Sequence, residues 1–223
     1  MDKGLFGQAL AKFASGLVVV GLLLFLPAGT MLWWRGWLLM AILFVPMFVA
    51  GLVMLANAPD LLRKRLDARE DEAEQRTVVA LSAVMFVTSF VLAGLTFRLG
   101  WPALPAWASW AGAVAFLLAY ALYAEVMREN AYLSRTIEVQ EDQHVVDTGL
   151  YGIVRHPMYS ATLLLFLSMP VVLGSPASVL VMLAYPLIIS KRIRNEEQVL
   201  ADGLKGYREY LQRVRWRLVP HVW

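Results

Sequence analysis

The densest group of chemically capable side chains in this sequence is residues 149–159, which read Gly-Leu-Tyr-Gly-Ile-Val-Arg-His-Pro-Met-Tyr and lie between hydrophobic segments. Arg155 carries a fixed charge, His156 has a titratable ring, and Tyr159 adds a phenol. Pro157 disfavours helical backbone at His156 and can itself begin a helix, so the stretch predicts a turn followed by a helix start. Free backbone amides at a helix start suit an anionic group. The alternative is a cap at the membrane interface, with the arginine facing lipid phosphates.

A second group is residues 192–197, Arg-Ile-Arg-Asn-Glu-Glu. Arg192 and Glu196 are four residues apart, so they share one face of a helix. One interpretation is a solvated surface pair, which stabilises a helix by only about 0.3 kcal/mol. The functional alternative separates their roles: Arg192 would hold a substrate carboxylate in a forked contact, and Glu196 would meet a cationic amine.

The composition narrows the class of protein. The chain has 223 residues, of which 59% are hydrophobic and 17% are charged. The absence of cysteine excludes disulfides, thiol nucleophiles and cysteine-metal sites. Three scattered histidines do not make a convincing metal site. Several apolar runs approach the roughly 20 residues that cross a bilayer, which indicates an integral membrane protein with no nucleic-acid partner.

Four apolar runs in the first part of the chain predict transmembrane helices, at residues 13–26, 37–55, 78–97 and 107–127. We expect the first to be a retained helix, because the residues after it make a poor signal-peptide cleavage site. Tryptophans near the ends of these runs are typical of interfacial belts; they are Trp33, Trp34, Trp37, Trp101, Trp107 and Trp110. Residues 59–76 carry both signs of charge and predict a solvated loop or surface helix. The alternative there is an anionic-lipid contact through residues 63–65.

The second part of the chain is more polar and is expected to hold the chemistry. Two shorter apolar runs, 160–173 and 178–189, are interrupted by Pro170 and Pro186 and predict a helical hairpin packed inside the bundle. Residues 191–223 are charged and predict a cytosolic helix with a tail. The expected fold is therefore an all-α integral membrane protein with four N-terminal transmembrane helices, a C-terminal helical hairpin and a cytosolic C-terminal helix. We expect one domain, 1–223, with a scaffold over 1–127 and the cofactor-binding and catalytic portion over 128–223.

The cations predict the orientation. With the N-terminus inside, all but two of the 20 lysines and arginines fall on the inner side, and only Arg35 and Arg98 fall outside. This bias follows the positive-inside rule and predicts a multi-pass protein with both termini in the cytosol, located in the inner membrane if the source is bacterial. The turn at residues 155–157 and the charged C-terminal segment then share the cytosolic face.

Together these residues resemble the isoprenylcysteine carboxyl methyltransferase family, which is related to membrane phospholipid methyltransferases. The matching residues, in the family's order, are Gln140, His144, Val145, Val146, Gly149, Tyr151, Arg155, His156, Pro157, Tyr159, Arg192, Glu196, Glu197, Tyr207, Tyr210 and Pro220. Three features depart from the family pattern: a stretch from His144 to Tyr151 that is one residue shorter, alanine for glycine at Ala161, and Leu-Lys-Gly at 204–206 in place of a phenylalanine-glycine.

The resemblance implies a methyltransferase that uses S-adenosyl-L-methionine inside a helical bundle. The sequence agrees in lacking the Gly-x-Gly-x-x-Gly fingerprint of a Rossmann sheet. It implies that Arg192 touches the methyl acceptor and that Glu196 binds the amino-acid end of the cofactor, which makes these two the catalytic candidates. The residues that the resemblance assigns to cofactor binding are Gln140, His144, Val145, Val146, Tyr151, His156, Pro157, Met158, Tyr159 and Glu196.

The chemistry favours an acceptor that ionises without help. A carboxylate, with a solution pKa of roughly 4, needs no general base, whereas an amine or thiol does, and Glu197 or His156 would be the nearest candidates. The membrane setting predicts a lipophilic or prenylated acceptor that enters sideways from the surrounding lipids. Two alternatives stay open: a phospholipid-amine or small-thiol methyltransferase, and a non-enzymatic membrane protein that retains the fold. The oligomeric state is not predicted.

Overall fold

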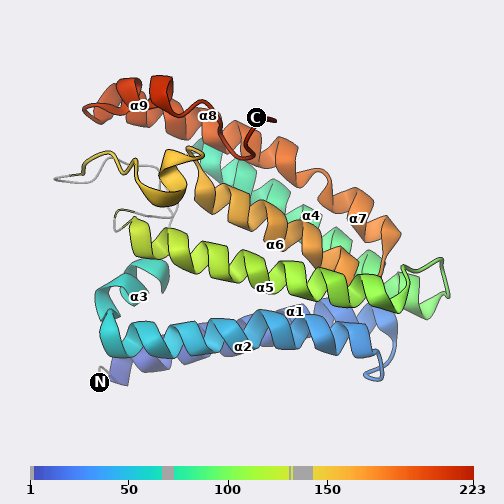
Figure 1. Cartoon of the computed structure of the whole chain (residues 1–223). Coiled ribbons are helices and arrows are strands. Elements are labelled where there is room, and N and C mark those ends of the chain that lie inside the picture. The colour runs from blue at the N-terminus through green and yellow to red at the C-terminus, as the bar shows by residue number, and fades with distance from the viewer. Residues whose placement is uncertain (1–2, 67–72, 131, 133–142) are drawn as a thin grey trace.

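The computed structural model describes residues 3–66, 73–130, 132 and 143–223, and its regular elements are all helices. Figure 1 shows long helices lying side by side in a bundle, with short elements gathered at one end. In chain order the helices are α1 (Lys3–Ala28), α2 (Trp34–Asn57), α3 (Pro59–Leu66), α4 (Ala73–Arg98), α5 (Ala106–Glu129), the 3-10 helix η1 (Gly149–Gly152), α6 (Pro157–Leu173), α7 (Pro176–Met182), α8 (Tyr185–Gly203) and α9 (Tyr207–Arg213).

The four predicted apolar runs lie inside α1, α2, α4 and α5. Each of these helices is long and apolar enough to cross a bilayer, and so is the segment Pro176–Gly203, which contains α7 and α8. The apolar part of that last segment ends at Ser190, and we take the membrane-spanning part to end there. The prediction of an all-α membrane protein is therefore confirmed for the described residues.

Glycines set the closest helix contacts. A Cβ atom on Gly94 of α4 would lie 2.7 Å from the backbone oxygen of Leu24 in α1. On α5, a Cβ atom on Gly112 would lie 3.0 Å from the backbone nitrogen of Val172 in α6. Without a side chain at these positions the backbones approach directly, and dispersion contacts along the helices hold the bundle together. These two contacts fix α4 and α6 against the N-terminal helices.

The predicted helical hairpin is present, with differences at its ends. α6 runs down to Leu173 and is capped by Gly174 in the left-handed conformation (φ 70°), after which α7 and α8 return along the bundle. Pro186 does break the returning arm, because α8 begins at Tyr185. The prediction that Pro170 interrupts the first arm was wrong, since it lies within α6, where its carbonyl accepts the capping hydrogen bond from Gly174. The charged segment from Lys191 is not a separate helix: α8 passes through that boundary unbroken.

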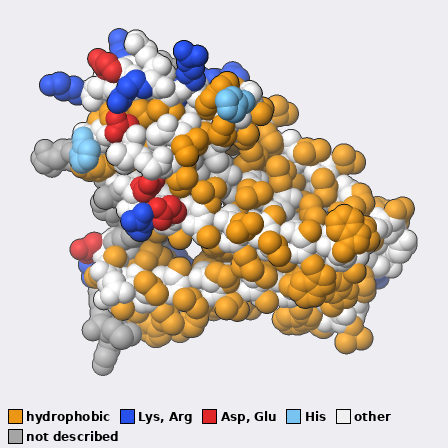
Figure 2. Space-filling model, viewed as in Figure 1, with side chains coloured by type: hydrophobic (Ala, Val, Ile, Leu, Met, Phe, Trp, Pro, Cys, Tyr) orange, Lys and Arg blue, Asp and Glu red, His pale blue; other side chains and the backbone are white. Residues whose placement is uncertain are grey.

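The two ends of the bundle differ in charge. Figure 2 shows hydrophobic side chains over most of the visible face, while blue and red groups gather at one end. The N-terminus, η1 and α9 lie at that same end (Figure 1). On α3, Arg63 pairs with Asp60 at 2.7 Å, which fits the predicted surface helix. The remaining residues of the predicted charged loop lie partly outside the described residues.

At the opposite end, Arg35 links two connections. Its Nη2 donates to the Leu104 carbonyl oxygen at 2.6 Å and its Nη1 lies 3.5 Å from the Gly174 carbonyl oxygen. A guanidinium keeps its charge at every accessible pH, so both contacts are charge-assisted. Arg35 therefore acts as a brace between the connection before α5 and the end of α6.

Candidate functional site

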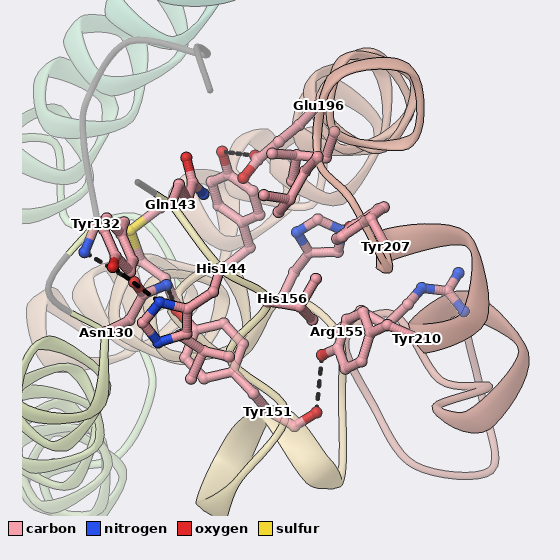
Figure 3. Close-up of a pocket in the computed structure, with 16 residues that line it drawn as sticks. Asn130, Tyr132, Gln143, His144, Tyr151, Arg155, His156, Glu196, Tyr207 and Tyr210 are labelled. Atoms are coloured by element: carbon pink, nitrogen blue, oxygen red, sulfur yellow. Dashed lines mark hydrogen bonds between the residues drawn. The ribbon is translucent and has the colours of Figure 1, made fainter. Parts of the chain in front are cut away.

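A pocket opens at the charged end of the bundle, where the end of α5, the segment 143–146, η1, and the start of α6 meet α8 and α9. Figure 3 shows its labelled side chains converging from these elements on one space. The empty space between its walls, including the open mouth, is about 790 Å³. The lining residues are Asn130, Tyr132, Gln143, His144, Val145, Val146, Tyr151, Arg155, His156, Met158, Tyr159, Glu196, Leu200, Leu204, Tyr207 and Tyr210.

The predicted turn and helix start are confirmed. His156 has non-helical backbone angles (φ −126°, ψ 63°), and Pro157 is the first residue of α6. The His156 ring is 5% exposed and stacks on Tyr159, with ring centroids 5.7 Å apart and an interplanar angle of 29°. Pro157 itself is fully buried behind the turn and does not line the pocket. The proline thus shapes the backbone, while the neighbouring rings form the wall.

A buried carboxylate holds this turn in place. Glu197 Oε1 accepts from Arg155 Nε at 2.7 Å and lies 3.3 Å from His156 Nε2. Its other oxygen accepts two hydrogen bonds from Arg217, at 2.9 and 2.8 Å. The side chains of Arg155 and Glu197 are each only 9% exposed. Arg155 therefore does not face lipid phosphates, which was one interpretation of the sequence, because its guanidinium is buried and paired with Glu197.

The surroundings of Glu197 decide its protonation state. Burial by itself would raise the pKa of the carboxyl group, but the hydrogen bonds from His156, Arg217 and Arg155 outweigh burial and lower the pKa to about 2. A carboxylate with so low a pKa is a poor proton acceptor at neutral pH. Glu197 was one of two candidate general bases in the sequence, and this structure removes it from that role.

The C-terminal segment closes the back of the turn. The backbone nitrogens of Arg155 and His156 donate to the carbonyl oxygens of Trp216 and Arg217, both at 2.9 Å. Ser160 Oγ donates to the Leu218 oxygen at 2.6 Å, which adds a third link. The backbone N–H groups of the turn thereby find hydrogen-bond acceptors although the turn belongs to no sheet or helix. Residues 216–218 of the predicted tail therefore form a strap that supports the turn from behind, and we call them the C-terminal strap.

Adjacent carboxylates on α8 point in different directions. Glu197 joins an ion cluster with Arg155, His156 and Arg217, whereas Glu196 lines the pocket. Tyr159 Oη donates to Glu196 Oε2 at 2.6 Å, and Arg192 Nε donates to the same Tyr159 Oη at 2.9 Å. Arg192 and Glu196 share a helix face as predicted, but a phenol from α6 bridges them. Arg192 itself does not line the pocket and lies behind Tyr159.

Three side chains tie η1 to its neighbours. Asn130 Nδ2 donates to Tyr151 Oη at 2.9 Å, and Tyr210 Oη donates to the Tyr151 carbonyl oxygen at 2.7 Å. Glu129 Oε2 accepts from the backbone nitrogen of Leu150 at 3.0 Å. Burial raises the pKa of Tyr151 to about 12, and it raises the pKa of Tyr210 further above the ordinary value. Both phenols therefore stay protonated and serve as neutral hydrogen-bonding walls.

The glycine that opens the predicted motif has a physical reason to be glycine. Gly149 has a φ of 50°, in the left-handed region that side chains disfavour. A Cβ atom there would clash with Glu129 Oε1. Any side chain would displace Glu129 and break the hydrogen bond that Glu129 accepts from the backbone nitrogen of Leu150.

The structure brings together most of the predicted cofactor residues. His144, Val145, Val146, Tyr151, His156, Met158, Tyr159 and Glu196 all line the one pocket. His144 Nδ1 lies 2.9 Å from Tyr132 Oη. Gln140 lies outside the described residues. The shortened stretch before Tyr151 thus still places residues 144–146 at the pocket.

Five lining residues were not singled out from the sequence: Asn130, Tyr132, Gln143, Leu200 and Leu204. Leu200 could have been found, because it lies one helical turn after Glu196 on the same face of α8. Asn130, Tyr132 and Gln143 lie in a stretch of sequence without hydrophobic periodicity, so sequence patterns carry no signal for them.

Comparison with known proteins agrees with this geometry. Residues 111–202, which include most of the pocket, match the model of the isoprenylcysteine carboxyl methyltransferase (ICMT) family. The predicted resemblance is confirmed, and the integral membrane methyltransferase that it implied is the class of this protein. The five apolar helical segments found among the described residues agree with a multi-pass membrane protein.

Individual relatives extend the likeness beyond the matched residues. Probable protein-S-isoprenylcysteine O-methyltransferases from indica and japonica rice are each 28% identical over 183 residues, which cover 75% of this chain and 92% of theirs. A mouse Δ14-sterol reductase is 30% identical over 91 residues, but the match covers only 22% of that enzyme and 40% of this chain. The solved structure of a eukaryotic intramembrane Ras methyltransferase, ICMT, superposes with a TM-score of 0.61 at 19% identity, covering 96% of this chain and 77% of that one. The ICMT-like fold thus includes the N-terminal helices.

Proposed function

We propose that this ICMT-family protein transfers a methyl group from S-adenosyl-L-methionine to the carboxylate of a lipophilic, isoprenylcysteine-like acceptor and so forms a methyl ester. The observation that carries the proposal is a chain of hydrogen bonds that begins on the pocket wall and continues behind it to Arg192. Glu196 faces the pocket, Tyr159 bridges, and Arg192 follows, so that an anionic and a cationic binding group are two hydrogen bonds apart. Such a pair suits methyl transfer from this donor to a carboxylate, since the donor carries an ammonium and the acceptor a negative charge.

The residues of the pocket suit the proposed cofactor. Glu196 offers a carboxylate to the ammonium of the amino-acid end. Val145, Val146 and Met158 offer apolar surface, and the His156 ring can stack on the adenine. When bound, the cofactor supplies an electrophilic methyl group on a sulfonium.

Arg192 would hold the acceptor carboxylate in line with that methyl group. One carboxylate oxygen attacks the methyl carbon, the carbon–sulfur bond breaks, and the sulfur keeps the bonding electron pair, so no proton moves. The protein's contribution is alignment and the exclusion of water, which makes the carboxylate a stronger nucleophile. The low pKa of Glu197 agrees with a reaction that needs no base, because this buried carboxylate is committed to its cations.

The orientation is part of the proposal. We place the charged end, with the pocket and both termini, in the cytosol, since it carries nearly all the lysines and arginines. Residues 1–127 would then act as scaffold and residues 128–223 as the cofactor-binding and catalytic portion of a single domain. A water-soluble cofactor would reach the pocket from the cytosol, while a prenylated acceptor would arrive from the bilayer between helices.

Substitution of Arg192 tests the proposal. Purified protein in nanodiscs is incubated with methyl-labelled cofactor and a panel of prenylcysteines, phospholipids and thiols, and the product is treated with mild alkali. We expect an alkali-labile methyl ester with the prenylcysteines. Arg192→Ala should lower the turnover at least 100-fold, because an oriented, charge-assisted contact is lost, while binding of S-adenosylhomocysteine changes less than threefold.

The matched control is Arg194→Ala, an exposed arginine on the same helix that does not line the pocket. It should retain near wild-type turnover. Equal loss of turnover and cofactor binding in Arg192→Ala would contradict the assigned roles. An alkali-stable product would instead support the amine or thiol acceptor, and a chain that binds no S-adenosylhomocysteine would support the non-enzymatic alternative.

A further inference from the structure

A second hollow in the molecule is a groove between α1 and α2, over which α3 packs. α3 lies at the charged end of the bundle, beside the end of α2 (Figure 1). The groove is separate from the candidate functional site, because the two share no lining residue. The residues that line the groove are Phe6, Ala9, Leu10, Lys12, Phe13, Met47, Phe48, Gly51, Leu52, Met54, Leu55, Leu62 and Leu66.

The apolar walls of the groove leave room between them. A Cβ atom added to Gly51 of α2 would meet no atom within 4 Å. Leu10 on α1 and Leu52 on α2 line the groove and are 44% and 43% exposed. On α3, by contrast, Leu62 is only 4% exposed and packs in a small core cluster with Leu55. The groove can therefore take an apolar chain from the bilayer, while packing holds α3 in place beside it.

Lys12 of α1 is the one charged residue among the described residues that line the groove. Its Nζ donates to the carbonyl oxygen of Leu66, the last residue of α3. An ammonium has three N–H donors, and within the described part of the chain this carbonyl is its one hydrogen-bond partner. A carbonyl carries only a partial negative charge, so most of the charge of Lys12 is not compensated by a described residue.

The depth of Lys12 makes this charge costly. α1 rises by about 24 Å from Lys12 to Ala28, which is less than the roughly 30 Å of a hydrocarbon core. The exposed rings of Trp34 and Trp37, shortly after Ala28, are typical of the opposite interface. Lys12 therefore lies at the edge of the hydrocarbon region, where an ionisable side chain is expensive and indicates a functional contact.

We propose that the groove binds an anionic phospholipid from the leaflet at the charged end of the bundle. One acyl chain lies along the groove over Gly51, and the phosphate group contacts Lys12. Such a lipid presents a negative charge where its apolar chains begin, which matches one cation at the edge of an apolar groove. A soluble anion would make no use of the apolar walls, and an uncharged lipid would make no use of Lys12.

Native mass spectrometry of the delipidated protein in detergent measures this binding. The protein is offered equal amounts of dioleoylphosphatidylglycerol and dioleoylphosphatidylcholine, which have the same chains and differ in net charge. We expect about fivefold more retention of phosphatidylglycerol, the preference that one cation near a membrane surface provides. Glycerol 3-phosphate, which has the phosphate without the chains, should not be retained.

Substitutions in the groove locate the bound lipid. Lys12→Gln removes the charge and should reduce the preference to about 1, whereas Lys12→Arg should keep it. Gly51→Leu fills the open part of the groove and should lower the retention of both lipids at least about fivefold. The matched control is Gly7→Leu on α1, because Gly7 is an equally open position that does not line the groove. It should keep wild-type retention.

Equal retention of the two lipids by wild type would overturn the proposal, and this comparison needs no variant. A preference that persists in Lys12→Gln, unchanged retention in Gly51→Leu, or retention of glycerol 3-phosphate would overturn it as well. A dimer that persists in place of the lipid would assign the groove to a second copy. Displacement of the lipid by N-acetyl-S-farnesylcysteine would assign it to the chain of a methyl acceptor. None of these results bears on whether a methyl ester forms, so the proposed function is judged separately.

Discussion

Substitution Glu197→Gln tests whether the ion cluster behind the pocket supports the fold. The change keeps the shape of the side chain and removes its charge. Arg155, which is 9% exposed, then has no carboxylate beside it, and Arg217, which is 30% exposed, loses two charge-assisted hydrogen bonds. Breaking a buried pair by removing one partner typically costs several times more than losing a surface pair.

The magnitude follows from the pKa of Glu197, which falls from an ordinary 4.5 to about 2 in the folded protein. This lowering corresponds to about 3 kcal/mol of stabilisation by the ionised form at neutral pH. The folded-state pKa is the lower one, so this stabilisation is complete above about pH 4.5 and is lost as the pH falls towards about 2. Glu197→Gln should remove this part of the acid dependence.

The assay is thermal unfolding in detergent, followed by intrinsic tryptophan fluorescence at pH 7 and at pH 4. We expect the midpoint of Glu197→Gln to fall by about 6 °C or more at pH 7. The control is Glu209→Gln, which changes an exposed carboxylate on α9 and should shift the midpoint by less than about 2 °C. A midpoint for Glu197→Gln equal to that of this control would refute the reasoning, since it would mean that the cluster contributes no net stability.

Two glycine substitutions test the backbone. Gly149→Ala should weaken S-adenosylhomocysteine binding at least about tenfold by calorimetry, because the left-handed φ and the clash with Glu129 Oε1 both oppose a Cβ atom. Wild-type affinity would show that the pocket tolerates a shift of η1. Gly94→Val should lower the thermal midpoint by separating α4 from Leu24 of α1, whereas Gly7→Ala, which meets no atom within 4 Å, should not lower it. Equal midpoints for these two variants would mean that α1 and α4 do not pack at Gly94.

Much of the architecture could be predicted from local patterns. The four long apolar helices follow from hydropathy, since a bilayer requires about 20 apolar residues in a row. The start of α6 at Pro157 follows from steric restriction by the proline ring. In both cases the cause acts within a few residues along the chain. The ends of the hairpin were less predictable, because Pro170 lies in the last turn of a helix whose Gly174 cap determines where it stops.

The residues of the site could be predicted where the order of residue types in the sequence identifies them. The direction in which their side chains point could not be predicted, because packing between distant segments determines it. The sequence alone determined that a basic, titratable and aromatic turn at 155–159 precedes a helix with Arg192 and Glu196 one turn apart. Only the tertiary structure decided that Glu197 neutralises Arg155, while Glu196 faces the pocket. Successive residues on a helix point about 100° apart, so which of two adjacent glutamates meets the pocket depends on how α8 is rotated against α6 and the C-terminal strap. That rotation is set by contacts between residues far apart in the chain, such as the one between Arg217 and Glu197, and a local pattern does not contain them.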